Sequence, residues 1–101
     1  MVRVIVERQI KKGEQLKLGE AILALRSEAI KQPGYMMGET WVDVRDPLRH
    51  VVISSWIGIE LWQAWENSPE RQALVAKIEP LLASPSRTTV LRSVGEVEVG
   101  K

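Results

Sequence analysis

The residues of this sequence that could support binding or chemistry gather around one stretch, from His50 to Leu74. Three of the four tryptophans lie in it, at positions 56, 62 and 65. Trp62 and Trp65 are three residues apart in a predicted helix and therefore share one face. His50 is the only histidine, and histidine is the side chain whose ordinary pKa lies nearest neutrality. This stretch therefore predicts the core and, beside it, any ligand pocket.

Several kinds of catalytic site are excluded by residue type and spacing. One histidine and scattered carboxylates do not supply spaced metal ligands, so no metal site is expected. The glycines do not form a phosphate-binding loop. Ser54 and Ser55 share a predicted strand with His50, but that arrangement does not make a catalytic triad. The absence of cysteine excludes disulfides and thiolate chemistry. The residues alone name no reaction.

Composition indicates one soluble domain covering 1–101, with 45% hydrophobic and 27% charged residues. Fourteen basic and thirteen acidic residues give a net charge of +1, which favours neither nucleic acid nor an anionic membrane surface as partner. No apolar run approaches the length of a membrane span. Arg3, Glu7 and Arg8 interrupt the region where a signal peptide needs its apolar run. We expect a cytoplasmic protein.

Hydrophobic periodicity predicts six regions of regular structure. Alternation indicates a strand over about 2–10, and a helical stripe runs from 14 to 31 until Pro33-Gly34. Two strands joined by a hairpin turn follow. A helical region then breaks at Asn67-Ser68-Pro69, restarts, and ends at Ser84-Pro85-Ser86, before a last strand that passes Gly95 with a bulge or bend. The remaining strands are predicted at 35–44, 49–56 and 88–99.

The order β-α-β-β-α-β predicts an α+β, ferredoxin-like fold, with a four-stranded antiparallel sheet and the helices on one face. Strict alternation in the second strand places Tyr35, Met37 and Trp41 on one side and bulky residues also on the other. A strand that is apolar on both faces is normally covered on both. Because the chain has no further segment for the second face, we expect a homodimer closed through the open sheet face.

The segment in which the strand ending at Trp56 turns into a helix resembles the corresponding segment of the antibiotic biosynthesis monooxygenase-like domains, a family of small dimeric α/β-barrel proteins. The resemblance covers about residues 2–94 and includes the Pro33-Gly34 turn and the helix end at 76–82. Its most specific part consists of Trp56, Glu60, Leu61, Trp62, Trp65 and Ser68-Pro69.

The resemblance implies several possible activities. Members of the family oxidise polyphenols, anthrones or quinols without metal or flavin, degrade haem, or isomerise a signalling sugar. The haem-degrading branch has an asparagine where this chain has Glu7 and a histidine where it has Val75, so only Trp65 matches. Without an axial ligand, haem is not expected, and we expect no cofactor. A second family pattern places histidine after Ser-Pro, where this chain has Glu70.

The leading hypothesis is a cofactor-independent monooxygenase acting on a small aromatic or quinol-like molecule. Such chemistry needs a base and an apolar, water-poor pocket. The candidate catalytic residues are Glu7 and His50, although a paired surface carboxylate and a hairpin-end histidine are the simpler interpretations. The candidate substrate-binding residues, each of which could equally serve packing or ion pairing, are Trp65, Tyr35, Trp62 and Arg92.

An alternative is a non-catalytic dimeric protein that binds or responds to a small molecule on the same fold. The absence of the family's usual histidines favours it, because fold does not fix function. An isomerase or lyase-like activity is a third possibility. An enclosed apolar cavity that holds a titratable side chain would favour the enzyme, whereas an apolar cavity alone would suit a binding protein.

Overall fold

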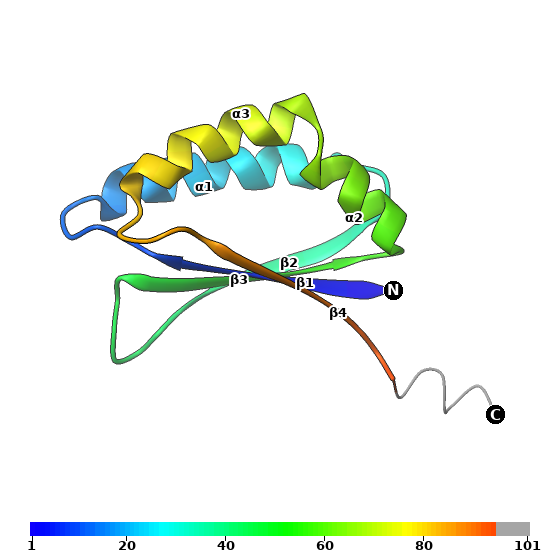
Figure 1. The fold of residues 1–101 in the computed structure, drawn as a ribbon, viewed down its shortest axis with the longest axis horizontal. Coiled ribbons are helices and arrows are strands. Elements are labelled where there is room, and N and C mark those ends of the chain that lie inside the picture. The colour runs from blue at the N-terminus through cyan, green and yellow to red at the C-terminus, as the bar shows by residue number, and fades with distance from the viewer. Residues whose placement is uncertain (95–101) are drawn as a thin grey trace.

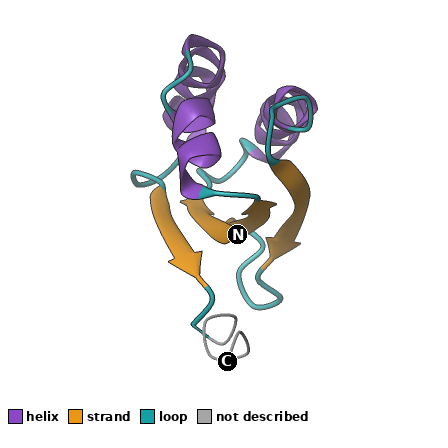
Figure 2. Cartoon of the chain, turned by 90° about the vertical axis from the view of Figure 1, so that its right-hand side faces the viewer, coloured by secondary structure: helices purple, strands orange, loops and turns teal. Residues whose placement is uncertain are grey.

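The protein is described by a computed structural model over residues 1–94, in which one layer of helices covers one face of a sheet (Figure 1; Figure 2). The four strands are antiparallel and lie in the order β2-β3-β1-β4. The predicted ferredoxin-like arrangement is confirmed, with the second helical region divided in two. The elements are β1 (Val2–Gln9), α1 (Gln15–Ala29), β2 (Tyr35–Val42), β3 (Arg49–Trp56), α2 (Ile59–Glu66), α3 (Pro69–Ile78), the 3-10 turn η1 (Glu79–Leu81) and β4 (Arg87–Arg92).

The central strand β1 supplies the middle of the core by simple alternation. Val2, Val4 and Val6 are buried, and the residues between them are more exposed. Val6 lies opposite Val52 of β3, so the even-numbered residues of both strands face the helices. A first core cluster joins these valines to Trp56, Trp62 and Trp65. A second lies at the other end of the helix layer and contains Ile10, Leu18, Ile78 and Leu82.

The break between α2 and α3 was predicted correctly from Ser68-Pro69. The Ser68 hydroxyl accepts a hydrogen bond from the backbone N–H of Arg71 at 3.2 Å and donates one to the carbonyl of Trp65 at 2.8 Å. Proline suits the first helical position because its missing N–H would have no partner there. One serine therefore fixes both the end of the helix that carries Trp65 and the start of the helix that carries Arg71.

Two predicted elements were too long. The helix expected to continue to Ser84 ends at Ile78 and tightens into η1, because Pro80 cannot donate into an α-helical turn and its ring crowds the turn before it. The second strand ends at Val42 rather than at residue 44. The last strand is assigned over Arg87–Arg92. The predicted bulge at Gly95 and the tail over 96–99 lie outside the described residues.

The alternation predicted for β2 was wrong at its start. The register shifts between Tyr35 and Met37, which marks a β-bulge: Tyr35 lies opposite Trp56, whereas Met37 lies opposite Ser55. An extra residue in a strand turns the side chains that precede it to the other face. Tyr35 therefore faces the helices together with Trp56, whereas Met37 and Trp41 lie on the other face.

The sheet face away from the helices is open, as expected. Trp41 is 56% exposed and Met37 52% exposed on it, and Leu91 of β4 is also exposed. The helices all lie on the other side of the sheet (Figure 2). No helix within residues 1–94 is long and apolar enough to cross a membrane.

The turn before β2 generates a stability prediction, because Gly34 and Gly13 both have positive φ but differ in their surroundings. At Gly34 (φ +86) a Cβ would lie 2.8 Å from the Cβ of Leu61, whereas at Gly13 (φ +90) it would meet nothing within 4 Å. Gly13→Ala should cost roughly 1–2 kcal/mol through backbone strain alone. Gly34→Ala should cost at least about 1 kcal/mol more, because overpacking is added. Urea unfolding followed by tryptophan fluorescence, at one protein concentration, measures both. Equal losses would show that Leu61 moves away freely.

Candidate functional site

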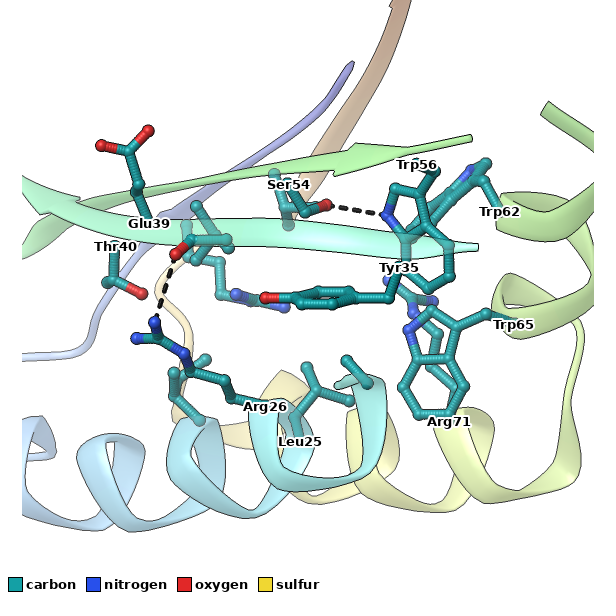
Figure 3. A pocket seen from close by; sticks show the side chains of 16 residues that line it. Leu25, Arg26, Tyr35, Glu39, Thr40, Ser54, Trp56, Trp62, Trp65 and Arg71 are labelled. Carbon is teal, nitrogen blue, oxygen red and sulfur yellow. Dashed lines mark hydrogen bonds between the residues drawn. The ribbon is translucent and has the colours of Figure 1, made fainter. Parts of the chain in front are cut away.

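A cavity of about 70 Å³ lies between the sheet and the helices, and it is partly open to solvent (Figure 3). Side chains from three strands and three helices line it. Its apolar wall is formed by Val6, Ile22, Leu25, Ala29, Val52, Tyr35, Trp56, Trp62 and Trp65. A largely apolar cavity with a few polar groups is the usual form of a small-molecule site.

Trp56 holds the aromatic part of this wall together. Its ring meets that of Tyr35 edge-on, with centroids 5.4 Å apart and planes at 90°, and that of Trp62 at 5.6 Å and 65°. These are favourable geometries for aromatic pairs. The indole N–H of Trp56 donates to the Ser54 hydroxyl at 3.0 Å. Trp62 and Trp65 are each only 3% exposed, so the wall is a packed surface with few alternative positions.

Tyr35 reaches the cavity because of two local features of β2. The bulge after it turns its side chain toward the helices. Gly38 then leaves room for the ring, since a Cβ at that position would collide with the Tyr35 hydroxyl and lie 3.4 Å from Cζ. Figure 3 shows the ring extended across the space between Ser54 and Leu25, with the hydroxyl at its far end.

Two arginines, Arg8 of β1 and Arg71 of α3, also line the cavity. Arg8 is only 4% exposed, and its Nε has no hydrogen-bond partner within residues 1–94. Burial and, to a lesser extent, the charge of Arg71 lower the pKa of Arg8 to about 10, while Glu79 opposes the shift. Burial also lowers the pKa of Arg71, opposed by Glu66 and Glu79. Both arginines carry charge that is poorly solvated.

The remaining polar lining is already engaged or directed elsewhere. Arg26 of α1 lines the cavity, but its guanidinium donates to the Gly38 carbonyl at 3.1 Å (Figure 3). The carboxylate of Glu39 points away from the Tyr35 ring in the same view, whereas Thr40 lies beside Arg26. The cavity thus combines an aromatic wall, one phenol hydroxyl and two arginines without ion-pair partners among the described residues.

Of the six residues proposed from the sequence, three come together here: Trp65, Trp62 and Tyr35 all line the cavity. Glu7 does not. It lies on the open face of β1 and accepts a hydrogen bond from Arg49 Nη2 at 2.6 Å. Arg92 is exposed opposite Val2 at the end of β4. By register, Glu7 and Arg92 lie on opposite faces of the sheet, so their side chains do not come together.

His50 has an intermediate position. It lies opposite Arg8 in the register of β1 and β3, on the helix side, but it does not line the cavity. Burial lowers the pKa of His50, and the nearby charge of Arg8 lowers it further, while a hydrogen bond to the Pro47 backbone acts in the opposite direction. The imidazole is therefore mainly neutral at neutral pH.

The sequence interpretation missed Arg8 and Arg71, although a signal existed for the first. Arg8 continues the alternation of Val2, Val4 and Val6 and so falls on the buried face of β1. A charged side chain is rarely fully buried unless it is paired. Arg71 carried no comparable signal, because it follows Glu70 in the first turn of α3, where charged residues are common. Its guanidinium lies 5.1 Å from the centroid of the Trp62 ring, a contact that sequence spacing does not reveal.

A comparison with models of protein families shows to which family the chain is related. The model described as antibiotic biosynthesis monooxygenase matches residues 1–77. The chain belongs to this family. The resemblance inferred from the tryptophan-containing segment is thereby confirmed.

Within residues 1–94, no group of three or more histidine, aspartate or glutamate side chains is placed to hold a metal ion.

Solved structures share the fold of this family member at low sequence identity. SnoaB from Streptomyces nogalater, described as a cofactor-independent oxygenase, superposes with a TM-score of 0.84 at 12% identity, over 92% of each chain. A conserved protein from Methanosarcina mazei gives a TM-score of 0.86 at 14% identity, over 91% of each chain. Identities this low establish the common fold only.

One curated relative matches along the sequence. Protein SchA from Streptomyces halstedii is 26% identical over 101 residues, which is 98% of this chain and 27% of SchA. The chain thus spans about a quarter of the length of that relative.

The shifted pKa of the single histidine can be tested directly. We expect the imidazole proton resonances of His50 to titrate with a pKa below 6.5, because burial disfavours the charged form. Arg8→Gln should raise that pKa part of the way toward 6.5, since it removes a nearby positive charge while burial remains. Arg3→Gln, which alters an exposed arginine of the same strand, is the control. An unchanged His50 pKa in Arg8→Gln would contradict the placement of the two side chains.

Proposed function

We propose that this protein is a cofactor-independent monooxygenase acting on a small aromatic or quinol-like substrate. The observation that supports the proposal is the aromatic-lined cavity between sheet and helices, with Tyr35 extended across it. Such an environment excludes most water while it presents a flat apolar surface to a ring. The fold shared with SnoaB is consistent with this function.

The roles follow from position. Trp65 and Trp62 form the wall against which a ring packs, and the Tyr35 hydroxyl, which can donate and accept hydrogen bonds, orients the substrate's oxygen. Of Glu7, His50 and Tyr35, only Tyr35 lines the cavity. We therefore assign the orientation of the acidic substrate group to Tyr35, and the released proton leaves toward solvent through the open side.

The reaction needs no external reductant. An activated methylene or phenol loses a proton, and the resulting anion transfers one electron to O₂. Recombination of the radical pair at carbon forms a peroxide anion, which takes up a proton from solvent to give a hydroperoxide, and loss of water leaves a carbonyl. For a methylene group the balance is CH₂ + O₂ → C=O + H₂O, so one oxygen atom enters the product and the other enters water.

A second candidate is a binding protein without catalysis. It is favoured by one specific observation: the only carboxylate among the cavity residues, that of Glu39, points away from the Tyr35 ring. A protein that only binds a ring needs no base in contact with it. The two candidates share the same ligand position and differ in turnover.

We also propose that the protein is a homodimer closed through the open sheet face. Trp41 and Met37 of β2 and Leu91 of β4 are exposed on this face, on the two outer strands of the sheet. Aromatic residues and methionine are enriched in the buried centres of interfaces. An apolar surface of this kind on a small domain is typically covered by a partner.

The oxygenase proposal is tested by oxygen uptake with metal-free protein and a panel of anthrones, catechols and quinols. Uptake should occur with at least one compound. Tyr35→Phe, which keeps the ring and removes only the hydroxyl, should lower the rate by roughly a hundredfold, within the range attributed to a positioned acid or base. Trp65→Phe should lower the rate as well, because it loosens the wall. Val44→Ala, at a residue that is 96% exposed, is the control.

The outcomes separate the two candidates. Full activity in Tyr35→Phe and Trp65→Phe would place the reaction outside this cavity. If no compound supports uptake while one of them perturbs the amide resonances of cavity residues, the binding protein is supported instead.

The dimer is tested by sedimentation at micromolar concentration, where we expect about twice 11.4 kDa. Trp41→Glu should give the monomer, because it places a charge within the proposed apolar interface. Leu16→Glu changes another exposed apolar residue, 85% exposed on α1, and should leave the dimer intact. A monomeric parent protein, or a dimer that is unaffected by Trp41→Glu, would rule out this interface.

A further inference from the structure

We propose that Arg8 and Arg71 form an anion-recognition site at the inner side of the cavity, so that the natural ligand is an aromatic acid bound as its carboxylate or phenolate anion. The inference rests on the proposed function in taking the cavity as the ligand site. It goes further by assigning the ligand a negative charge. Neither the family match nor the named relatives assign a role to these two arginines.

The first argument is the state of Arg8. Its side chain is 96% buried, since only 4% remains exposed, and it lines the cavity. Its Nε is buried without a hydrogen-bond partner in the described part of the chain, and it forms no ion pair there within 4.0 Å. A buried cation is costly unless it is paired. An anion that enters the cavity would supply the missing partner.

The second argument is the position of Arg71. It lines the same cavity from α3, and its guanidinium lies 5.1 Å from the centroid of the Trp62 ring. Stacking of this kind fixes a guanidinium while leaving its edge free to donate. The charge of Arg71 acts on Arg8 strongly enough to lower the pKa of Arg8. Two cations held near each other repel, and an anion between them would relieve that repulsion.

Among residues 1–94, no carboxylate already fills this role. Glu79 acts on both arginines through space, but its Oε1 accepts a hydrogen bond from Ser86 at 2.9 Å, and it forms no ion pair within 4.0 Å with either arginine. Glu66 acts on Arg71 only at longer range. The contrast with Arg26 is informative, because that cavity arginine has a backbone carbonyl as partner.

Size restricts the ligand further. The cavity of about 70 Å³ is smaller than the roughly 150 Å³ of a cavity known to bind benzene. The enclosed part therefore holds the anionic group and part of one ring, and the rest of a larger ring system extends toward the open side. Guanidinium groups suit planar oxyanions because their N–H groups form a fork. A ring that carries a carboxylate or an acidic phenol matches both the arginines and the aromatic wall.

The test compares benzoate with benzamide, two probes of nearly the same shape that differ in charge. Binding is measured by NMR titration of the full chain at pH 7 and low salt, with assigned amides of the cavity residues as the readout. Benzoate should bind at least tenfold more tightly than benzamide. The difference should shrink to less than threefold in Arg8→Gln and in Arg71→Gln, while the affinity for benzamide stays within threefold of the parent.

Three further variants keep the result interpretable. Arg3→Gln removes an exposed arginine of β1 that does not line the cavity, and the preference for benzoate should survive. Arg8→Lys keeps the charge but loses the fork, and it should retain part of the preference. Arg8→Met replaces the side chain with an apolar one of similar length, so that it serves if the glutamine variant does not fold. Thermal unfolding of each variant verifies that the fold is retained.

The possible results distinguish this inference from the oxygenase proposal. Equal affinity for benzoate and benzamide, or a preference that persists in Arg8→Gln, Arg8→Met and Arg71→Gln, would overturn the anion site even if neutral quinols are oxidised. A preference that depends on both arginines would establish the site, and it would stand even if no compound supports oxygen uptake.

Discussion

The packing of Trp56 is the interaction on which most of this structure depends. The residue ends β3, is 1% exposed, and contacts Tyr35 of β2 and Trp62 of α2 edge-on. One ring therefore connects the outer strand of the sheet to the helix layer. Trp56 occupies the centre of the aromatic cluster, and the cavity lies beside its ring. The wall offered to a ligand is thus a continuation of the core, which explains how a chain of 101 residues can maintain both.

The first strand of the fold shows how stability and binding share the same residues. Val2, Val4 and Val6 bury apolar surface against the helices, and the next residue on that face is Arg8. A valine there would extend the core without any desolvated charge. The chain instead places a cation in the lining of the cavity that Trp62 and Trp65 also line, and the charge of Arg71 acts on it. A buried group that costs stability is best explained by a function at that position.

Much of this arrangement could be predicted from the sequence, because its causes are local. Alternation fixed the buried face of β1, Ser68-Pro69 divided the helices, and the spacing of Trp62 and Trp65 placed both on one face. The failures also have physical causes. The bulge that turns Tyr35 inward leaves no signature in the residue pattern, and the room that Gly38 provides is visible only when the ring is in place. Arg71 depended on a contact between two helices that no spacing rule describes.

The separation of Glu7 from the cavity changes how the chemistry must be understood. If no carboxylate contacts the substrate, deprotonation must be favoured by stabilising the anion that forms rather than by a strong adjacent base. Cations in a poorly hydrated site do this effectively, because their attraction for a negative charge is weakly screened there. The two arginines would then lower the pKa of a bound phenol or activated methylene, while Tyr35 holds its oxygen in place. In the proposed oxygenase, Arg8 and Arg71 would supply the charge that stabilises the reactive anion, so that no histidine would be needed for this step.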